Sequence, residues 1–138
     1  MTTVSEVMTS QPVTVSAADT IQQAEDIMFE ENIRQLPVVK GRELVGIVTD
    51  RDIRSFLGGR VLESLTERER ALQMKVAAVM TAKPVSVDPD SDLRDAVDLL
   101  IDEKIGGLPV VNSDGYLVGI ITYVDALKFL AQLLEPSP

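Results

Sequence analysis

The sequence predicts an α/β (α+β) fold in which two tandem βαββα units pack together with pseudo-twofold symmetry. Two observations carry this prediction: long strings of sequence recur at a nearly fixed separation, and each copy has the same order of β-rich runs and helical patterns. A unit of roughly 45 residues is also near the lower limit for burying an adequate core alone, so the two should close against each other. We expect the units at 1–57 and 79–134, a connecting helix or linker at 58–78 and a tail at 135–138.

The repeat consists of three pairs of strings. The first two pairs are 72 residues apart, and the third is 73 apart because the second copy has one extra residue in its NSDG turn. The pairs are VMTSQPVTV from Val7 with VMTAKPVSV from Val79, ENIRQLPVV from Glu31 with EKIGGLPVV from Glu103, and LVGIVTDRD from Leu44 with LVGIITYVD from Leu117.

Each unit begins with a short alternating segment, VTV or VSV, which is typical of a strand and is followed by a polar turn. A helix should follow, capped in the first unit by Asp19 with Gln22 as its capping-box partner. Apolar residues then recur at helical spacing in both units. They are Ile21, Ala24, Ile27 and Met28, and Leu93, Ala96, Leu99 and Leu100.

Two β-rich runs come next in each unit, LPVV with LVGIV and LPVV with LVGII, and the turns between them contain Gly41 and Gly115. Each pair predicts a hairpin. Helical patterning resumes at 50–57 and 124–134, which completes the βαββα order. The segment between the units is also helical in pattern, with one face formed by Leu62, Leu65, Leu72 and Val76; it is expected to be a connecting helix, with a partner contact as the alternative.

The composition of the chain excludes several classes of partner and of catalytic chemistry. The formal net charge of −9 should repel nucleic acids and anionic membranes. No apolar run approaches the roughly 20 residues that span a bilayer, so we expect a cytoplasmic protein. Cysteine and histidine are absent, which excludes disulfides, thiolate nucleophiles and serine–histidine dyads. No G-x-x-x-x-G-K or G-x-G-x-x-G string occurs. We therefore expect no enzymatic activity.

The strings GIVTDRD and GIITYVD place Thr49 with Asp52, and Thr122 with Asp125, where a strand ends and a helix begins. One interpretation is a plain capping box in each unit. The other is a binding site, because a helix N-terminus attracts phosphate and an ionised carboxylate can accept hydrogen bonds from both hydroxyls of a ribose. Duplication of the whole arrangement favours the site.

These motifs together resemble a tandem CBS-domain protein, a stand-alone pair also known as a Bateman module. The resemblance covers about residues 4–130 and rests on the paired strings quoted above. It implies the βαββα fold, a homodimer, and a regulatory ligand that is AMP, ADP, ATP or S-adenosylmethionine, with no obligatory cofactor. It implies neither a nucleic-acid nor a membrane partner.

The resemblance also implies roles for individual residues. Asp52 and Asp125 would bind ribose hydroxyls, and Thr49 and Thr122 would contact ribose or phosphate. The Asp125 cleft would add adenine contacts from Val13 and Ile33 and a phosphate contact from Arg34. The Asp52 cleft would add Val85 and Ile105, with Lys83 or Arg51 at the phosphate.

Several alternatives stay open at this stage. The four apolar residues can instead be core, and Arg34 and Lys83 can be solvated surface cations. Gly106 and Gly107 stand where the first unit has Arg34 and Gln35, so the two clefts should not be equivalent. The acidic cluster Asp88, Asp90 and Asp92 lacks the glycine and glutamate of a calcium loop, so we expect helix-start acidity rather than a metal site.

The leading hypothesis is a non-catalytic regulatory module whose output passes through a separate effector protein. The alternative is a structural or protein-interaction module without a nucleotide ligand, in which the Thr-x-x-Asp boxes are only helix caps.

Overall fold

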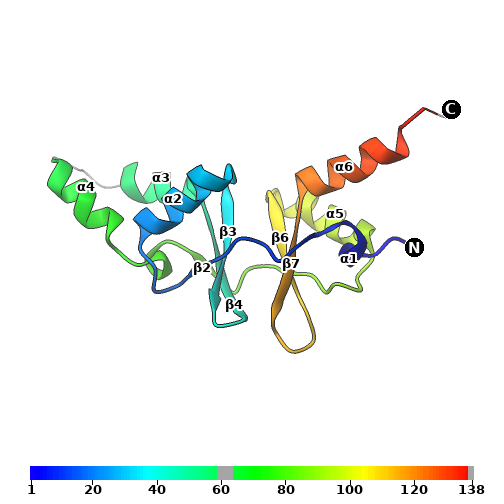
Figure 1. The fold of residues 1–138 in the computed structure, drawn as a ribbon, viewed down its shortest axis with the longest axis horizontal. Helices are drawn as coiled ribbons and strands as arrows, with labels where there is room; N and C mark the ends of the chain where they lie inside the picture. Colours follow the sequence, from blue (N-terminus) through cyan, green and yellow to red (C-terminus); the bar gives the residue numbers. More distant parts are fainter. Residues whose placement is uncertain (59–63, 137–138) are drawn as a thin grey trace. The chain divides into compact units, whose positions relative to one another are not determined.

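The computed structural model describes residues 1–58 and 64–136, which form two compact units. The central unit is Val13–Pro84, and the terminal unit combines Met1–Pro12 with Val85–Pro138. Each unit is a small sheet with helices, in the order shown in Figure 1. The predicted α/β fold of two tandem units is confirmed. No helix in the described ranges is both long and apolar enough to cross a membrane.

The central unit contains a four-stranded sheet with the order β2-β3-β4-β5. Strands β3 and β4 form the predicted antiparallel hairpin, and β2 runs parallel to β3. The strands are β2 (Val15–Ser16), β3 (Gln35–Lys40), β4 (Glu43–Thr49) and β5 (Thr81–Ala82). The helices are α2 (Ile21–Glu31), α3 (Asp50–Gly58) and α4 (Leu65–Leu72), with a 3-10 turn η1 (Val76–Ala78).

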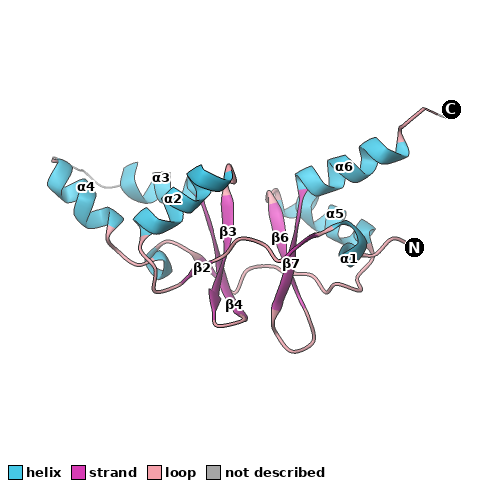
Figure 2. Ribbon diagram, viewed as in Figure 1, coloured by secondary structure: helices cyan, strands magenta, loops and turns pink. Residues whose placement is uncertain are grey.

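The terminal unit contains a three-stranded antiparallel sheet with the order β1-β7-β6. Figure 2 labels its two longer strands, β6 and β7. Its elements are α1 (Val4–Val7), β1 (Thr9–Ser10), α5 (Leu93–Glu103), β6 (Gly107–Val111), β7 (Leu117–Thr122) and α6 (Tyr123–Leu133). The strand expected at VSV is reduced to a single parallel bridge between Val87 and Val110. The second copy therefore keeps the parallel pairing of the first but over one residue pair.

The leading segment of each repeat joins the unit formed by the other repeat. Thr9 of β1 pairs with Ile120 of β7, and Thr81 of β5 pairs with Ile47 of β4. The units expected at 1–57 and 79–134 follow the repeat along the sequence, whereas the compact units exchange these leading segments. The exchange explains why the terminal unit contains both ends of the described chain.

The two apolar stripes predicted from the sequence form the cores. Ile21, Ala24 and Met28 are buried on α2, and Leu93, Ala96 and Leu100 are buried on α5. Ile27 and Leu99 are partly buried against the same clusters. Burial of apolar area contributes about 25 cal/mol per Å², so these stripes stabilise each unit together with the buried side chains of the strands.

The prediction for the N-cap of the first long helix was wrong. The N-cap of α2 is Thr20, whose hydroxyl accepts a hydrogen bond from Gln23 N at 3.1 Å, while Asp19 accepts one from Ser16 N at 2.9 Å. The capping box therefore begins one residue later than expected, because Asp19 closes the preceding turn instead.

The segment at 58–78 is not one continuous connecting helix in its described part. Leu72 and Val76 are buried in the core of the central unit, but Leu65 is 78% exposed and does not share their face. Leu62 lies outside the described residues, as do 137–138 of the predicted tail. The segment thus contributes core side chains as well as linking the repeats.

Candidate ligand-binding sites

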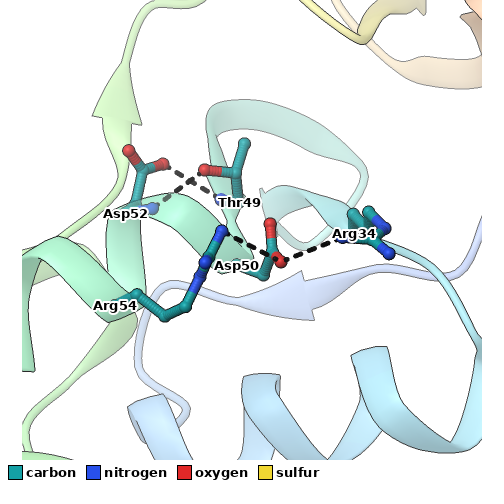
Figure 3. Close-up of polar contacts among 5 residues, drawn as sticks. All are labelled: Arg34, Thr49, Asp50, Asp52 and Arg54. Carbon is teal, nitrogen blue, oxygen red and sulfur yellow. Dashed lines mark hydrogen bonds and ion pairs between the residues drawn. The ribbon is translucent and has the colours of Figure 1, made fainter.

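Thr49 and Asp52 form a reciprocal hydrogen-bonded pair where β4 ends and α3 begins (Figure 3). Thr49 N donates to Oδ2 of Asp52 at 3.0 Å, and Asp52 N donates to Oγ1 of Thr49 at 3.0 Å. Both residues are half-buried. This is the geometry of a capping box, so the local interpretation of Thr-x-x-Asp as a helix cap is correct for this pair.

Thr122 and Asp125 repeat the arrangement at the start of α6. Thr122 N donates to Oδ2 of Asp125 at 2.9 Å, Asp125 N donates to Oγ1 of Thr122 at 3.2 Å, and that hydroxyl donates to Oδ2 at 3.0 Å. This carboxylate has one further partner: Oγ1 of Thr9 donates to Oδ1 of Asp125 at 3.0 Å. The two boxes are thus alike in backbone geometry but differ in how many donors each carboxylate receives.

The capping hydrogen bonds do not occupy all the acceptor positions of these carboxylates. An ionised carboxylate offers about four acceptor positions, and the positive end of a helix favours negative charge beside it. Among the described residues, the hydrogen bond from Thr49 N is the one that Asp52 accepts, and it is made through Oδ2. Oδ1 of Asp52 can therefore accept a donor from outside the protein, such as a sugar hydroxyl.

Arg34 lies beside the first box. The antiparallel register of β3 and β4 pairs Gln35 with Thr49, and Asp50 N donates to the carbonyl oxygen of Arg34 at 2.9 Å. The carboxylate of Asp50 also lies 3.8 Å from the Arg34 guanidinium and 3.6 Å from that of Arg54. Figure 3 marks both ion pairs with dashed lines. The Arg34 side chain is 83% exposed, so it can reach an anion in solvent.

The TDRD motif predicted a binding role for Asp52 but none for Asp50. The signal was available, since an acidic residue at the first position of a helix is stabilised there and can orient nearby cations. Asp50 forms ion pairs with both Arg34 and Arg54.

The four apolar residues assigned to the sites are not equivalent in burial. Val13, Val85 and Ile105 are 40%, 44% and 36% exposed, so their alternative interpretation as core is wrong. Ile33 is partly buried against the core of the central unit. Exposed aliphatic side chains are suited to contact the face of a flat apolar ring.

The remaining cations are both exposed. Lys83 has a left-handed backbone with φ of 49°, as does its repeat equivalent Gln11. Arg51 lies on the first turn of α3 between Asp50 and Asp52. Neither makes an ion pair with another described residue.

In the central unit the β3–β4 register and the bond from Asp50 N bring Arg34 next to the junction of Thr49 and Asp50. In the terminal unit Tyr123 N donates to the Gly106 carbonyl oxygen at 3.2 Å and Gly107 pairs with Thr122, and Ile105 immediately precedes these two glycines in the sequence. The grouping of Asp125 with Val13, Ile33 and Arg34, and of Asp52 with Val85 and Ile105, draws on residues of both units and stays a prediction.

The acidic cluster at 88–92 serves local structure. Asp88 accepts a hydrogen bond from Asp90 N at 2.8 Å, and Asp92 caps α5 by accepting one from Arg94 N at 3.0 Å. The interpretation as helix-start acidity is confirmed for Asp92. Over 1–58 and 64–136 no three acidic side chains gather in a way that could bind a metal ion.

Comparison with known proteins now defines the class. The CBS domain family matches the chain twice, at residues 4–59 and 76–132. The matched segments contain both hairpins and both Thr-x-x-Asp boxes described above. The chain therefore belongs to the CBS domain family and carries a tandem pair of these domains.

Particular relatives cover the whole pair. The chain is 33% identical over 138 residues to a CBS domain-containing protein of Dictyostelium discoideum, covering 98% of this chain and 95% of the relative. A crystal structure of CBSX2 in complex with AMP matches with a TM-score of 0.84 and 30% identity, covering 98% of this chain and 100% of that one. The CBS domain pair of protein MJ0100 in complex with 5′-methylthioadenosine and S-adenosyl-L-methionine matches with a TM-score of 0.81 and 25% identity, covering 96% and 98%.

Some relatives are longer enzymes. The chain is 36% identical over 113 residues to an inosine-5′-monophosphate dehydrogenase of Korarchaeum cryptofilum, covering 82% of this chain but 21% of the enzyme. The similarity is thus limited to about a fifth of that enzyme.

Proposed function

We propose that this chain is a non-catalytic regulatory module that binds an adenosyl ligand, such as AMP, ADP, ATP or S-adenosylmethionine. The single observation that carries the proposal is the duplicated junction at which a threonine hydroxyl and an aspartate carboxylate meet the N-terminus of a helix. Similar CBS pairs have been crystallised with AMP or with S-adenosyl-L-methionine, and this supports an adenosyl compound as the ligand.

In this proposal Asp52 and Asp125 accept hydrogen bonds from ribose hydroxyls. Thr49 and Thr122, each in the same box, contact the ribose or the phosphate. A carboxylate suits a vicinal diol because its two oxygens can accept from two hydroxyls at once. The helix dipole adds attraction for a phosphate near the same end.

The accessory residues complete the two sites. Arg34 and Lys83 are exposed cations that we assign to phosphate, and Val13, Ile33, Val85 and Ile105 contact adenine. The exposure of Val13, Val85 and Ile105 supports this assignment, since a side chain available to a ligand cannot be fully packed in the core. Ligand binding would regulate an effector protein only if the bound and free states of the module contact that protein differently.

We further propose that the module forms a homodimer through α6. This helix buries none of its residues within the chain, and Tyr123, Leu127 and Leu130 recur at helical spacing with exposures of 54%, 56% and 46%. A stripe of this kind is typical of a surface that packs against another helix.

A structural or protein-interaction module without a nucleotide ligand is the second candidate. The observation in its favour is that the hydrogen bonds of both Thr-x-x-Asp boxes form complete helix caps from the chain's own groups. On this hypothesis the aspartates serve stability alone.

Calorimetric titration with AMP, ATP and S-adenosylmethionine separates the two candidates. The wild type should bind at least one of these compounds, and Asp52→Asn and Asp125→Asn should weaken that binding. The same variants should be compared by thermal melting without ligand. A loss of melting temperature with no binding of any of the three compounds by the wild type would favour the structural module.

A further inference from the structure

The two boxes differ in one tertiary contact. Oγ1 of Thr9 donates to Oδ1 of Asp125 at 3.0 Å, across 116 residues of sequence and within the terminal unit. The repeat equivalent of Thr9 is Thr81, which occupies the same place in the central unit: Thr81 pairs with Ile47 as Thr9 pairs with Ile120. Between Thr81 and Asp52 no hydrogen bond is formed, although both residues belong to the described part of the chain.

This contact changes how much hydrogen-bonding capacity each carboxylate keeps. Asp125 accepts three hydrogen bonds from the protein, from Thr122 N, Thr122 Oγ1 and Thr9 Oγ1. Among the described residues Asp52 accepts one, from Thr49 N. Because a carboxylate has about four acceptor positions, Asp52 has room for both hydroxyls of a ribose and Asp125 has room for one.

We infer that Thr9 is an internal competitor for the sugar at Asp125, so that the Asp52 site is the stronger of the two. This inference rests on the proposed function and adds a specificity-determining residue to it. A ribose diol that binds Asp125 through both hydroxyls displaces the Thr9 hydroxyl, whereas the same diol displaces nothing at Asp52. The difference would have been invisible in the sequence, where VMTS and VMTA place an identical threonine in each repeat.

Displacement of the Thr9 hydroxyl would also change the structure around the Asp125 site. Thr9 lies in β1, a strand of two residues that pairs with β7. Its hydroxyl contact with Asp125 therefore connects the start of α6 to the leading segment of the chain. Occupancy of this site releases that contact, while occupancy at Asp52 leaves Thr81 unaffected.

The test uses the full chain, AMP as the probe, and backgrounds that isolate each site. In an Asp52→Asn background, calorimetry reports binding that depends on Asp125. Adding Thr9→Val removes the competing hydroxyl but keeps a β-branched side chain on an exposed strand position, and should tighten AMP by about three- to ten-fold, the range of one hydrogen bond. Thr9→Ser in the same background keeps the hydroxyl and should behave like Thr9.

The matched control is Thr81→Val in an Asp125→Asn background, where AMP affinity should not change. If Thr9→Val leaves the Asp125-dependent affinity unchanged, or if Thr81→Val tightens binding equally, the inference is overturned while the proposed function stands. If no variant and no wild-type protein binds AMP, ATP or S-adenosylmethionine, the proposed function fails and the inference fails with it.

Discussion

Gly119 lies so close to Thr9 that a Cβ atom at Gly119 would be 2.9 Å from the Thr9 carbonyl oxygen. The side chain of Met8 lies against the same position. Gly46 has the equivalent place in the central unit, where a Cβ would lie 2.9 Å from the carbonyl oxygen of Thr81. Both glycines therefore allow the leading segment of the other repeat to pair with the hairpin.

Gly119→Ala and Gly46→Ala should each destabilise the fold by about 2 kcal/mol, because a backbone oxygen cannot move aside as a flexible side chain can. Urea unfolding monitored by circular dichroism measures this. Gly58→Ala is the control, since a Cβ at Gly58 meets nothing within 4 Å, and its stability should change by less than about 1 kcal/mol. Equal effects for Gly58→Ala and Gly119→Ala would show that the close approach is not what requires glycine.

Helices α2 and α5 both end in a left-handed residue, and the two residues are at equivalent positions of the repeat. Asn32 has φ of 54° and Lys104 has φ of 53°. This conformation costs lysine more free energy than it costs asparagine, so Lys104→Gly should stabilise the protein by about 0.5–1 kcal/mol and Asn32→Gly by less. Lys75→Gly, at a φ of −73°, should instead destabilise it. Chemical denaturation would contradict this account if Lys104→Gly proved less stable than the wild type.

Arg34 offers a test of the phosphate assignment. Arg34→Ala should weaken AMP by about five- to ten-fold and leave adenosine unchanged, because the lost contact is a charge-assisted hydrogen bond to phosphate. Arg94 is a matched control: its side chain is 79% exposed and pairs with Asp98 at 3.1 Å, as Arg34 pairs with Asp50. Calorimetry showing equal losses for both variants, or an equal loss for adenosine, would remove Arg34 from the phosphate site.

The apolar stripe on α6 predicts the oligomeric state. The wild type should be a dimer by size-exclusion chromatography with light scattering, and Leu127→Lys should shift it to a monomer, because burying a lysine at a helix interface is unfavourable. Lys128→Gln alters the neighbouring exposed position and should leave the dimer intact. A monomeric wild type at high protein concentration would rule out the α6 interface.

Much of the fold could be predicted from the repeat. The spacing of apolar residues identified α2 and α5, because residues on the buried face of a helix recur every three or four positions. The turns that contain glycine identified both hairpins. The partner of each leading segment could not be predicted, since VMTSQPVTV and VMTAKPVSV are so similar that either could pair with either hairpin. Only tertiary packing distinguishes the two arrangements.

At the candidate sites, the local geometry could be predicted from the sequence but the tertiary contacts could not. Thr-x-x-Asp fixes the local capping geometry, which the structure reproduces at both junctions. The contact of Asp50 with Arg34 depends on the β3–β4 register, and the contact of Thr9 with Asp125 depends on the segment exchange. Neither relationship is encoded by spacing along the chain, so both required the structure.

The central claim is that a carboxylate at a helix start binds the hydroxyls of a ribose. It is tested most directly by comparing AMP with 2′,3′-dideoxy-AMP in calorimetric titrations of the wild type, Asp52→Asn and Asp125→Asn. The wild type should bind AMP at least about ten-fold more tightly than the dideoxy compound, and the preference should shrink when the aspartates are replaced. Equal affinity of the wild type for the two nucleotides would contradict the claim.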